Sequence, residues 1–456
     1  MLIILIIISF FVLVIFRNNW KKLIYLLVLM IPFFGYVQIK ILHLTLLAPL
    51  IQDITVILPI YFLFILDKMK KKNNQIYLPS RLKNFLLFFS LFIIVYTVNP
   101  FFNVDFWVRI VGVKVWIFYL LLIAIGFEFI ESEFELKKLC NFFAIVAIIP
   151  CVIGILQYLG SYYIDYKETM LFFYGGNELQ ARIVTQNLTE FHWGGGIEFF
   201  RLPSTFTFAT QFNAYTICAL VPTVASVSFS KTFNEKIFYS IIVGIVILGA
   251  YSSGIRSTTL YFLLFFIFFM LIRTQFYKVL SIAVVVFIAL SFTGIELFPT
   301  FMQTIFLNVS EITTYYGQNV IFSGYGNLLS SYFFGAGVGS NTFEARYVMF
   351  PGQIGFLTPG TEIFYQKVII ELGALGLVVV IMFFMIIIHE IVLSIRNLKD
   401  KQASVFCTLV LALFILMLIM ASKGGHIFTK YPSNFLFYLF FGMAIKLRFL
   451  NFDNKK

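Results

Sequence analysis

A few polar side chains at the edges of long apolar runs could act on a phosphate group. Arg201 lies in RLPSTFTFATQFNAY and Arg256 lies in YSSGIRSTT, each beside an apolar stretch. An arginine presents a planar, permanently charged fork that matches phosphate oxygens with two parallel hydrogen bonds. Two such residues could clamp a diphosphate, and Arg346 is a weaker third candidate. A single arginine of this kind could instead reach lipid phosphates or cap a helix end.

Candidates for a proton acceptor are few, because the chain holds 21 acidic residues and four histidines. Glu362 follows Pro359-Gly360 by two residues, at the expected start of an apolar helix. Partial burial at such a place raises the pKa of a carboxyl group toward the range of a working base. The spacing alone equally suits an acidic residue at the positive end of a helix. His192 and His426 are further candidates, although a histidine in an aromatic loop commonly has a packing role.

Glu362 belongs to a polar, glycine-rich stretch, residues 330–376, between apolar runs. Its glycines Gly335, Gly337 and Gly339 lack the preceding strand and the Lys-Ser/Thr ending of a nucleotide-binding loop. They predict a tight turn that needs a positive φ or a close backbone approach. A polar segment between membrane spans is a place where a membrane protein can hold water and substrate.

The elements that must position these residues are membrane-spanning helices. The 456 residues are 61% hydrophobic and 12% charged, whereas soluble domains carry about 25% charged residues. Composition therefore predicts one all-α, multi-spanning (polytopic) membrane domain over residues 1–456. Apolar runs long enough to cross the hydrocarbon predict about 13 transmembrane helices, within a range of about 12–14. They lie at 2–16, 23–39, 43–66, 84–100, 112–130, 139–159, 204–229, 237–252, 257–272, 279–295, 364–389, 404–422 and 433–448.

The basic residues predict how these helices are oriented. The formal net charge is +12, and most of the 33 lysines and arginines stand in short segments between apolar runs. This pattern is typical of the positive-inside rule rather than of nucleic-acid binding. It predicts an external N-terminus with a retained first span, and an internal C-terminus. Two large loops, 160–203 and 296–363, then face outside, and both are far longer than a helix connection needs.

Other polar or reactive residues point to structural roles. The four cysteines show no CxxC spacing and no neighbouring histidine, so the sequence predicts neither a metal site nor a disulfide framework. Asp53 falls in the middle of a predicted span. A carboxylate at that depth is either a functional residue or the partner of another buried polar group, and we favour the second interpretation.

Three patterns, in this order along the chain, resemble the O-antigen polymerase and O-antigen ligase superfamily of multi-spanning enzymes that assemble bacterial surface polysaccharides. RLPSTFTFATQFNAY resembles the Arg, small-residue and Asn segment that leads into a span after the first large external loop. SSGIRST resembles the small-small-x-Arg turn at the outer face. FGAGVGSNTF, followed by EIFYQKVIIELGALG, resembles the GxGxG turn and the later helix, in which a polar residue precedes Gly373 and Gly376. The resemblance spans roughly residues 140–390.

The resemblance implies a metal-independent membrane glycosyltransferase that uses no nucleotide sugar and no cofactor. Its donor would be an oligosaccharide on undecaprenyl diphosphate, and its acceptor the sugar hydroxyl of another lipid-linked repeat unit. The reaction would take place at the periplasmic face of the bacterial inner (cytoplasmic) membrane. Arg201 and Arg256 would stabilise the diphosphate leaving group, and Arg346 and His192 would make further contacts to diphosphate or sugar. Glu362 would accept the proton of the attacking hydroxyl.

Other functions stay open at this point. Ligases of the superfamily, which join polymer to lipid A-core, carry a histidine eleven residues before the first glycine of the later helix, where this chain has Glu362. This difference favours a polymerase of lipopolysaccharide biosynthesis, for which we expect membrane lipid, a chain-length regulator and a flippase as partners. A flippase or other transporter would show short external loops and internal repeats, neither of which the sequence displays. A membrane scaffold would explain the loops but not the external arginines.

Overall fold

The computed structural model describes residues 2–40, 50–70, 78–99, 104–175, 191–192, 198–255, 257–273, 323–342, 363–423, 427–429 and 431–450. Within these residues, regular structure is helical apart from one antiparallel pair of two-residue strands, β1 (Phe191–His192) and β2 (Glu198–Phe199). The prediction of an all-α membrane protein is confirmed at this level.

The N-terminal part of the chain forms helices, some of which are joined end to end by short 3-10 or π-helical turns. The helices are α1 (Leu2–Phe16), α2 (Lys21–Met30), α3 (Phe34–Lys40), α4 (Leu58–Lys70), α5 (Ser80–Val98), α6 (Phe106–Ile117) and α7 (Leu121–Phe129). A 3-10 turn at Ile31–Phe33 connects α2 to α3, and another at Phe118–Leu120 connects α6 to α7. A π-helical turn at Asp53–Ile57 leads into α4.

The C-terminal part holds the longer helices. They are α8 (Glu133–Tyr163), α9 (Tyr166–Tyr174), α11 (Ala209–Phe229), α12 (Phe233–Ser252), α13 (Thr258–Ile272), α17 (Ser323–Ser331), α19 (Phe364–Asn397), α20 (Lys401–Lys423) and α21 (Ser433–Leu447). The sequence fixes where α8 and α12 begin. The Ser132 side chain accepts from Glu135 N over 3.3 Å, and the Thr232 side chain accepts from Glu235 N over 3.2 Å. Both are Ser/Thr-x-x-Glu capping sequences, which satisfy backbone donors that a helix start leaves unpaired.

Eight described segments are long and apolar enough to cross a membrane, and three shorter helices are also apolar. The eight are Lys21–Ile39, Ser80–Val98, Phe106–Phe129, Glu133–Tyr163, Ala209–Phe229, Phe233–Ser252, Phe364–Asn397 and Lys401–Ser422. Helices overlie all or part of every predicted span except 279–295, which lies outside the described residues. The predicted number of spans therefore stays a prediction. The predicted start of the span 204–229 is wrong, because α11 begins at Ala209.

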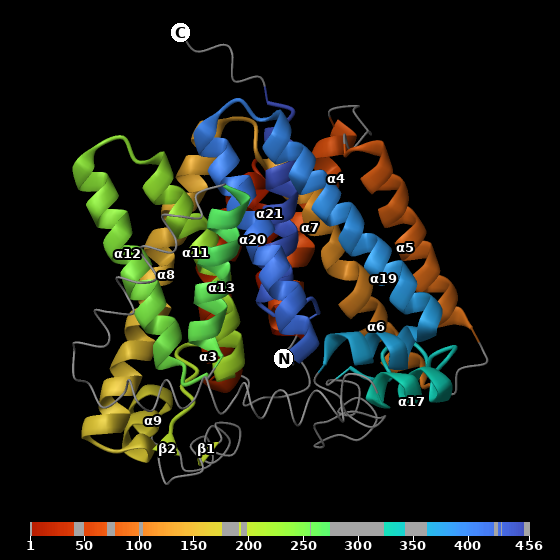
Figure 1. Cartoon of the computed structure of the whole chain (residues 1–456), viewed down its shortest axis with the longest axis horizontal. Coiled ribbons are helices and arrows are strands. Elements are labelled where there is room, and N and C mark those ends of the chain that lie inside the picture. The colour runs from red at the N-terminus through yellow and green to blue at the C-terminus, as the bar shows by residue number, and fades with distance from the viewer. Residues whose placement is uncertain are drawn as a thin grey trace.

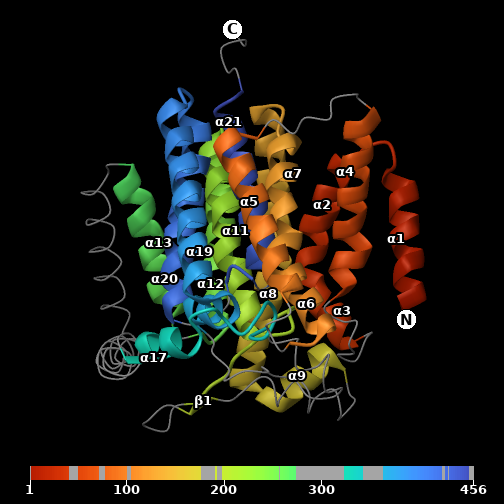
Figure 2. The same ribbon diagram turned by 90° about the vertical axis from the view of Figure 1, so that its right-hand side faces the viewer.

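The helices run side by side, and their ends gather at two opposite faces of the bundle (Figure 1 and Figure 2). One face, named the basic end, holds the last residues of α1, α4, α11, α19 and α21 and the first residues of α2, α5, α8, α12 and α20. Its basic residues include Arg17, Lys21, Lys68, Lys137, Lys231, Arg396 and Lys446. The opposite face, named the site end, carries α9, β1, β2 and α17. The described segments that were predicted to be internal thus share one face, and the side of the membrane that this face occupies stays a prediction.

Close backbone approach holds the centre of the bundle together. A Cβ on Gly126 of α7 would lie 2.3 Å from the Leu439 carbonyl oxygen of α21, and a Cβ on Gly442 would lie 2.1 Å from the Ile123 carbonyl oxygen. Small residues at such crossings let helix backbones pack directly, which is a common way for membrane helices to associate. Among the described spans α11 is the most enclosed, with 83% of its apolar window buried. It provides a fixed support for the segment that precedes it.

Asp53 is a buried partner of other polar groups, as we favoured from the sequence. Its Oδ2 atom lies 2.6 Å from Lys114 Nζ, and its Oδ1 atom accepts a hydrogen bond of 3.0 Å from Tyr119 OH. Asp53 is 4% exposed. The opposite charge and the hydroxyl satisfy the carboxylate inside an apolar bundle. They also tie the π-helical turn before α4 to the rod formed by α6 and α7.

Candidate functional site

Arg201 lies in an irregular stretch, residues 200–208, which enters the bundle just before α11 and is named the arginine segment. Ser204 and Phe206 are no more than 1% exposed, although neither is in a helix or strand. The chain stays irregular because Pro203 has no N–H to donate and Ser204 has a φ of 54°, which residues other than glycine rarely adopt. Irregular backbone inside a membrane protein requires protein groups to satisfy its polar atoms.

Gln157 of α8 provides two of these groups. Its Nε2 donates to the Ser204 carbonyl oxygen over 3.1 Å, and its Oε1 accepts from the Ser204 N–H over 2.9 Å. Tyr174 of α9 also donates to the Ser204 carbonyl oxygen, and Thr207 donates to Gln38 of α3 over 2.9 Å. Burial raises the pKa of the Tyr174 phenol, so this group stays protonated and able to donate. Three helices therefore fix the arginine segment.

The arginine segment also packs against the turn that joins α12 to α13. The Leu202 N–H donates to the Ser253 carbonyl oxygen over 3.2 Å. Gly254 has a φ of +66°. A Cβ on this residue would lie 3.3 Å from the Arg201 Cα atom and closer still to the carbonyl oxygen of Phe200. Glycine is required by both the backbone angle and the lack of space. The two sequence patterns that contain Arg201 and Arg256 are thus in direct backbone contact.

A second polar element at the site end is the stretch 332–342, named the glycine loop. Gly335, Gly337 and Gly339 all have a positive φ, of 81°, 108° and 89°. This confirms the tight turn predicted from their spacing. Residues of this loop are buried between helices, although they belong to the predicted external loop 296–363. The glycine loop, which is the buried part of that predicted loop, is therefore inserted between helices.

The glycine loop completes the backbone hydrogen bonds of a kink in α19. Gly373, inside this helix, has a φ of 70°, which interrupts the regular pattern of backbone bonds. The loop supplies replacement donors: Ala336 N donates to the Ile370 oxygen over 2.6 Å, and Gly337 N donates to the Glu371 oxygen over 3.2 Å. Kink and loop therefore form one structural unit.

On its other side the glycine loop lies against α6. A Cβ on Gly339 would lie 2.2 Å from the Val108 carbonyl oxygen, and a Cβ on Gly112 would lie 2.5 Å from the Gly339 nitrogen. The two backbones leave no room for side chains between them. The glycine loop is consequently held between α6 and α19.

A buried carboxylate, Glu371, links the loop to both helices. Its Oε2 accepts a hydrogen bond of 2.7 Å from Trp116 Nε1 of α6, and its Oε1 accepts from Asn341 N and Thr342 Oγ1, each over 3.0 Å. Lys367 Nζ lies 3.4 Å from the same oxygen and donates to Thr342 Oγ1 over 2.8 Å. Glu371 is 0% exposed and Lys367 is 2% exposed. These five residues, named the glutamate cluster, form a buried hydrogen-bonded network of the kind that fixes local geometry.

The predicted site residues are described to different extents. Arg201 is partly exposed at the site end, next to β2. His192 is described only by its backbone, which pairs with Glu198 in the two-stranded sheet. The predicted site residues Arg256, Arg346 and Glu362, and the further candidate His426, lie outside the described residues. The helix expected to begin beside Glu362 does begin there, at Phe364.

One arginine near the site end has a structural role. Arg109 of α6 donates through Nε to the Val104 oxygen over 2.8 Å, and through Nη1 to the Thr97 and Asn99 oxygens over 2.9 and 3.0 Å. It thereby satisfies carbonyl groups around the C-terminal end of α5, which a helix leaves unpaired. From the sequence, helix capping is the alternative to phosphate binding for a single arginine, and Arg109 has this capping role.

The site end thus combines the arginine segment, which three helices hold, with the glycine loop, which two helices hold (Figure 1 and Figure 2). Such an arrangement can bind an anionic group without reorganising when the ligand arrives. Among the described residues, no group of three or more His, Cys, Asp or Glu side chains is placed to hold a metal ion. Comparison with protein-family models found no match for this chain, and comparison with curated proteins found no relative. The function is therefore inferred from the residues of the site.

Proposed function

We propose that this protein polymerises lipid-linked polysaccharide repeat units. It transfers a glycan from undecaprenyl diphosphate to the sugar hydroxyl of another lipid-linked repeat unit, at the outer face of a bacterial inner membrane. The observation that carries this proposal is the hydrogen bond from Leu202 N to the Ser253 oxygen, which joins the arginine segment to the turn that leads to Arg256. Arg256 follows Gly254 of that turn by two residues in the sequence, and two arginines suit a diphosphate, which carries negative charge on both phosphoryl groups.

The proposed reaction exchanges one glycosidic bond for another. The acceptor hydroxyl attacks the anomeric carbon of the donor sugar, and the bond from that carbon to the diphosphate oxygen breaks. Undecaprenyl diphosphate leaves with the electron pair of that bond. The hydroxyl proton passes to a base, for which Glu362 is the candidate.

The arginines stabilise charge that grows during the reaction. Negative charge develops on the diphosphate as its bond to the sugar breaks, so a guanidinium held in advance lowers the energy of the transition state more than that of the bound donor. Gln157 and the fixed Ser204 backbone hold the arginine segment in place before the donor binds. Removal of one preorganised donor of this kind costs about 2.7–4 kcal/mol, or a rate factor of about 100–1,000. Arg346 and His192 are assigned weaker contacts to diphosphate or sugar.

The glycine loop and the glutamate cluster have a supporting role in this proposal. Glu362 precedes the first residue of α19, Phe364, by two positions. The direction in which α19 leaves the site end therefore sets where a base at position 362 can reach. The kink at Gly373 and the carboxylate of Glu371 fix that direction through the glycine loop.

The surface polysaccharide of a strain that lacks this protein separates the polymerase from its alternatives. Loss of the polymer ladder with one repeat unit retained on the lipid A-core supports a polymerase. Loss of every repeat unit from the core means a ligase, and repeat units retained inside the cell mean a flippase. Each outcome gives a distinct pattern on a lipopolysaccharide gel.

Complementation of that strain then tests the assigned arginines. At wild-type protein levels, Arg201→Ala and Arg256→Ala are each expected to leave single repeat units and to abolish long chains. Arg396→Ala is the matched control, because it removes the same charge from an exposed position at the basic end. Full-length chains in both site variants would contradict the assignment of the two arginines.

A further inference from the structure

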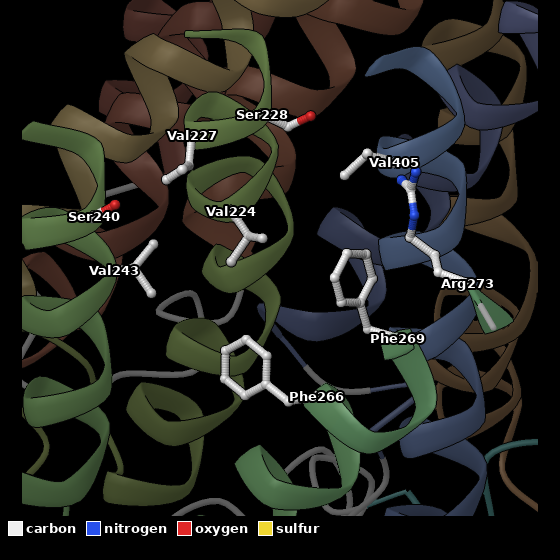
Figure 3. Close-up of a pocket in the computed structure, with 9 residues that line it drawn as sticks. All are labelled: Val224, Val227, Ser228, Ser240, Val243, Phe266, Phe269, Arg273 and Val405. Atoms are coloured by element: carbon white, nitrogen blue, oxygen red, sulfur yellow. The ribbon is translucent and has the colours of Figure 1, made fainter. Parts of the chain in front are cut away.

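A groove with a volume of about 440 Å³ runs along the surface of the bundle between α11, α12, α13 and α20 (Figure 3). Its lining is mostly apolar and includes Val224, Val227, Val243, Phe266 and Phe269. The volume falls within the range of about 300–1,000 Å³ that is typical of ligand sites in proteins. None of these residues belongs to the site described above.

The courses of α12 and α13 produce the groove. The tight turn at Gly254 joins these helices at the site end, and they separate toward the basic end (Figure 1). Val224 and Val227 of α11 form the floor between them. Ser240 on the α12 side of the groove is exposed, and the lining residues of α13 are partly exposed. The groove therefore opens outward from the bundle.

The surface beside the groove is apolar. α12 exposes Ile237, Phe238 and Ile241 at 43%, 48% and 57%. On a membrane-spanning helix, apolar side chains with such exposure face lipid hydrocarbon. The groove consequently opens toward acyl chains.

Arg273 gives the groove a positively charged end. It follows the last residue of α13, at the basic end, and its side chain points toward Val405 of α20 (Figure 3). The hydroxyls of Ser228 and Ser240 are the other polar side chains of the lining. Basic pockets between membrane helices near the membrane surface bind anionic lipid head groups, and a guanidinium matches phosphate oxygens.

We propose that this groove binds one anionic phospholipid, with an acyl chain against the valines and phenylalanines and the phosphate beside Arg273. Phe266 and Arg273 are seven residues apart on one helical course, a rise of about 10 Å, so the apolar lining and the charge succeed each other along the groove. Charge complementarity favours an anionic over a zwitterionic lipid. The proposal is independent of the polymerase function, because the groove lies toward the basic end and shares no residue with the arginine segment.

Lipid retention tests this proposal. Protein reconstituted in nanodiscs of phosphatidylglycerol and phosphatidylethanolamine in equal amounts is extracted into detergent, and retained lipid is counted by native mass spectrometry. Loss of one arginine near the membrane surface is worth about 1 kcal/mol, so Arg273→Gln is expected to lower phosphatidylglycerol retention about fivefold. Arg396→Gln removes the same charge at the same end from a residue that does not line the groove, and is expected to retain the wild-type amount. Equal retention by Arg273→Gln and Arg396→Gln overturns the proposal.

A second variant tests the apolar part without changing charge. Val227→Trp fills the floor of the groove and is expected to displace the bound phospholipid. Ile241→Trp places the same side chain on the exposed face of α12 and is expected to retain the phospholipid. Thermal unfolding shows whether both variants are folded. Wild-type retention by a folded Val227→Trp protein overturns the proposal.

A covalent probe identifies the occupant directly. A photoreactive benzoylphenylalanine in place of Phe266 is irradiated in native membranes, and the product is analysed by mass spectrometry. An adduct with an anionic phospholipid supports the proposal. An adduct with the apolar run 279–295 of the same chain, or with a polyprenyl lipid, means that another group fills the groove and overturns it.

Discussion

The replacement Gly254→Ala separates the arginine segment from the turn between α12 and α13 without touching a charged residue. Gly254 has a φ of +66°, and a Cβ there would lie 2.1 Å from the Phe200 carbonyl oxygen. That oxygen is a backbone atom and cannot rotate away. Gly244→Ala is the matched control on α12, the helix that leads into this turn, because a Cβ at Gly244 meets no atom within 4 Å.

Two costs arise from the alanine at position 254. A left-handed backbone costs a residue with a Cβ about 1–2 kcal/mol, and overpacking against a rigid neighbour adds about 1–3 kcal/mol. The total cost is about 2–5 kcal/mol, and its overpacking part is relieved only if the turn moves away from the arginine segment by about 1 Å. A misplacement of about 1 Å between catalytic groups lowers a rate by about 100-fold. In contrast, Gly244→Ala is expected to stabilise α12 by up to about 1 kcal/mol.

The assay is polymer synthesis by the purified variants, measured beside their thermal unfolding midpoints. Gly254→Ala is expected to remain folded and to lose about 100-fold in polymerisation rate, while Gly244→Ala keeps the wild-type rate. A Gly254→Ala protein with the wild-type rate and chain length would mean that this contact has no bearing on polymerisation.

Two further predictions concern the support of the site. Glu371→Gln leaves the buried Lys367 ammonium without its carboxylate and is expected to destabilise the protein by about 3–5 kcal/mol. Adding Lys367→Met is expected to recover most of this loss. An unfolding midpoint that Glu371→Gln leaves unchanged argues against a stabilising role of the pair. Burial raises the pKa of Tyr174, so its stabilising contribution is complete below the ordinary tyrosine pKa of about 10 and is lost as the pH rises above it. The wild-type unfolding midpoint should therefore fall more steeply than that of Tyr174→Phe above that pH, and parallel curves would contradict this.

Periodicity and composition predicted those parts of the fold that local physics decides. Apolar runs gave the positions of the helices because a helix satisfies the backbone polar groups of a spanning segment within the segment itself. The spacing of Gly335, Gly337 and Gly339 predicted a tight turn because few other residues tolerate a positive φ. The apolar run predicted to begin at residue 364 gave the start of α19, which begins at Phe364.

The remaining features depend on partners far away in the sequence. Residues 204–208 read as the start of an apolar span, but Gln157 satisfies the Ser204 backbone and so allows it to stay irregular. The hydropathy of residues 204–208 does not indicate that Gln157 is their partner. Glu371 was likewise missed as a site residue, since Trp116, which donates to it, is 255 positions away. The sequence signal that could have found it is Lys367, four residues earlier in an otherwise apolar helix.

The central claim is that a diphosphate-linked glycan is transferred by groups held at the site end. Its most direct test uses purified protein in liposomes with undecaprenyl-diphosphate-linked repeat units as the sole substrate, and measures polymer and released undecaprenyl diphosphate together. Wild-type protein is predicted to release one undecaprenyl diphosphate for each glycosidic bond that it forms. The Arg201→Ala protein is predicted to form neither product at a detectable rate. Equal product formation by the Arg201→Ala protein, or translocation of the substrate by the wild-type protein without release of the carrier, would contradict the claim.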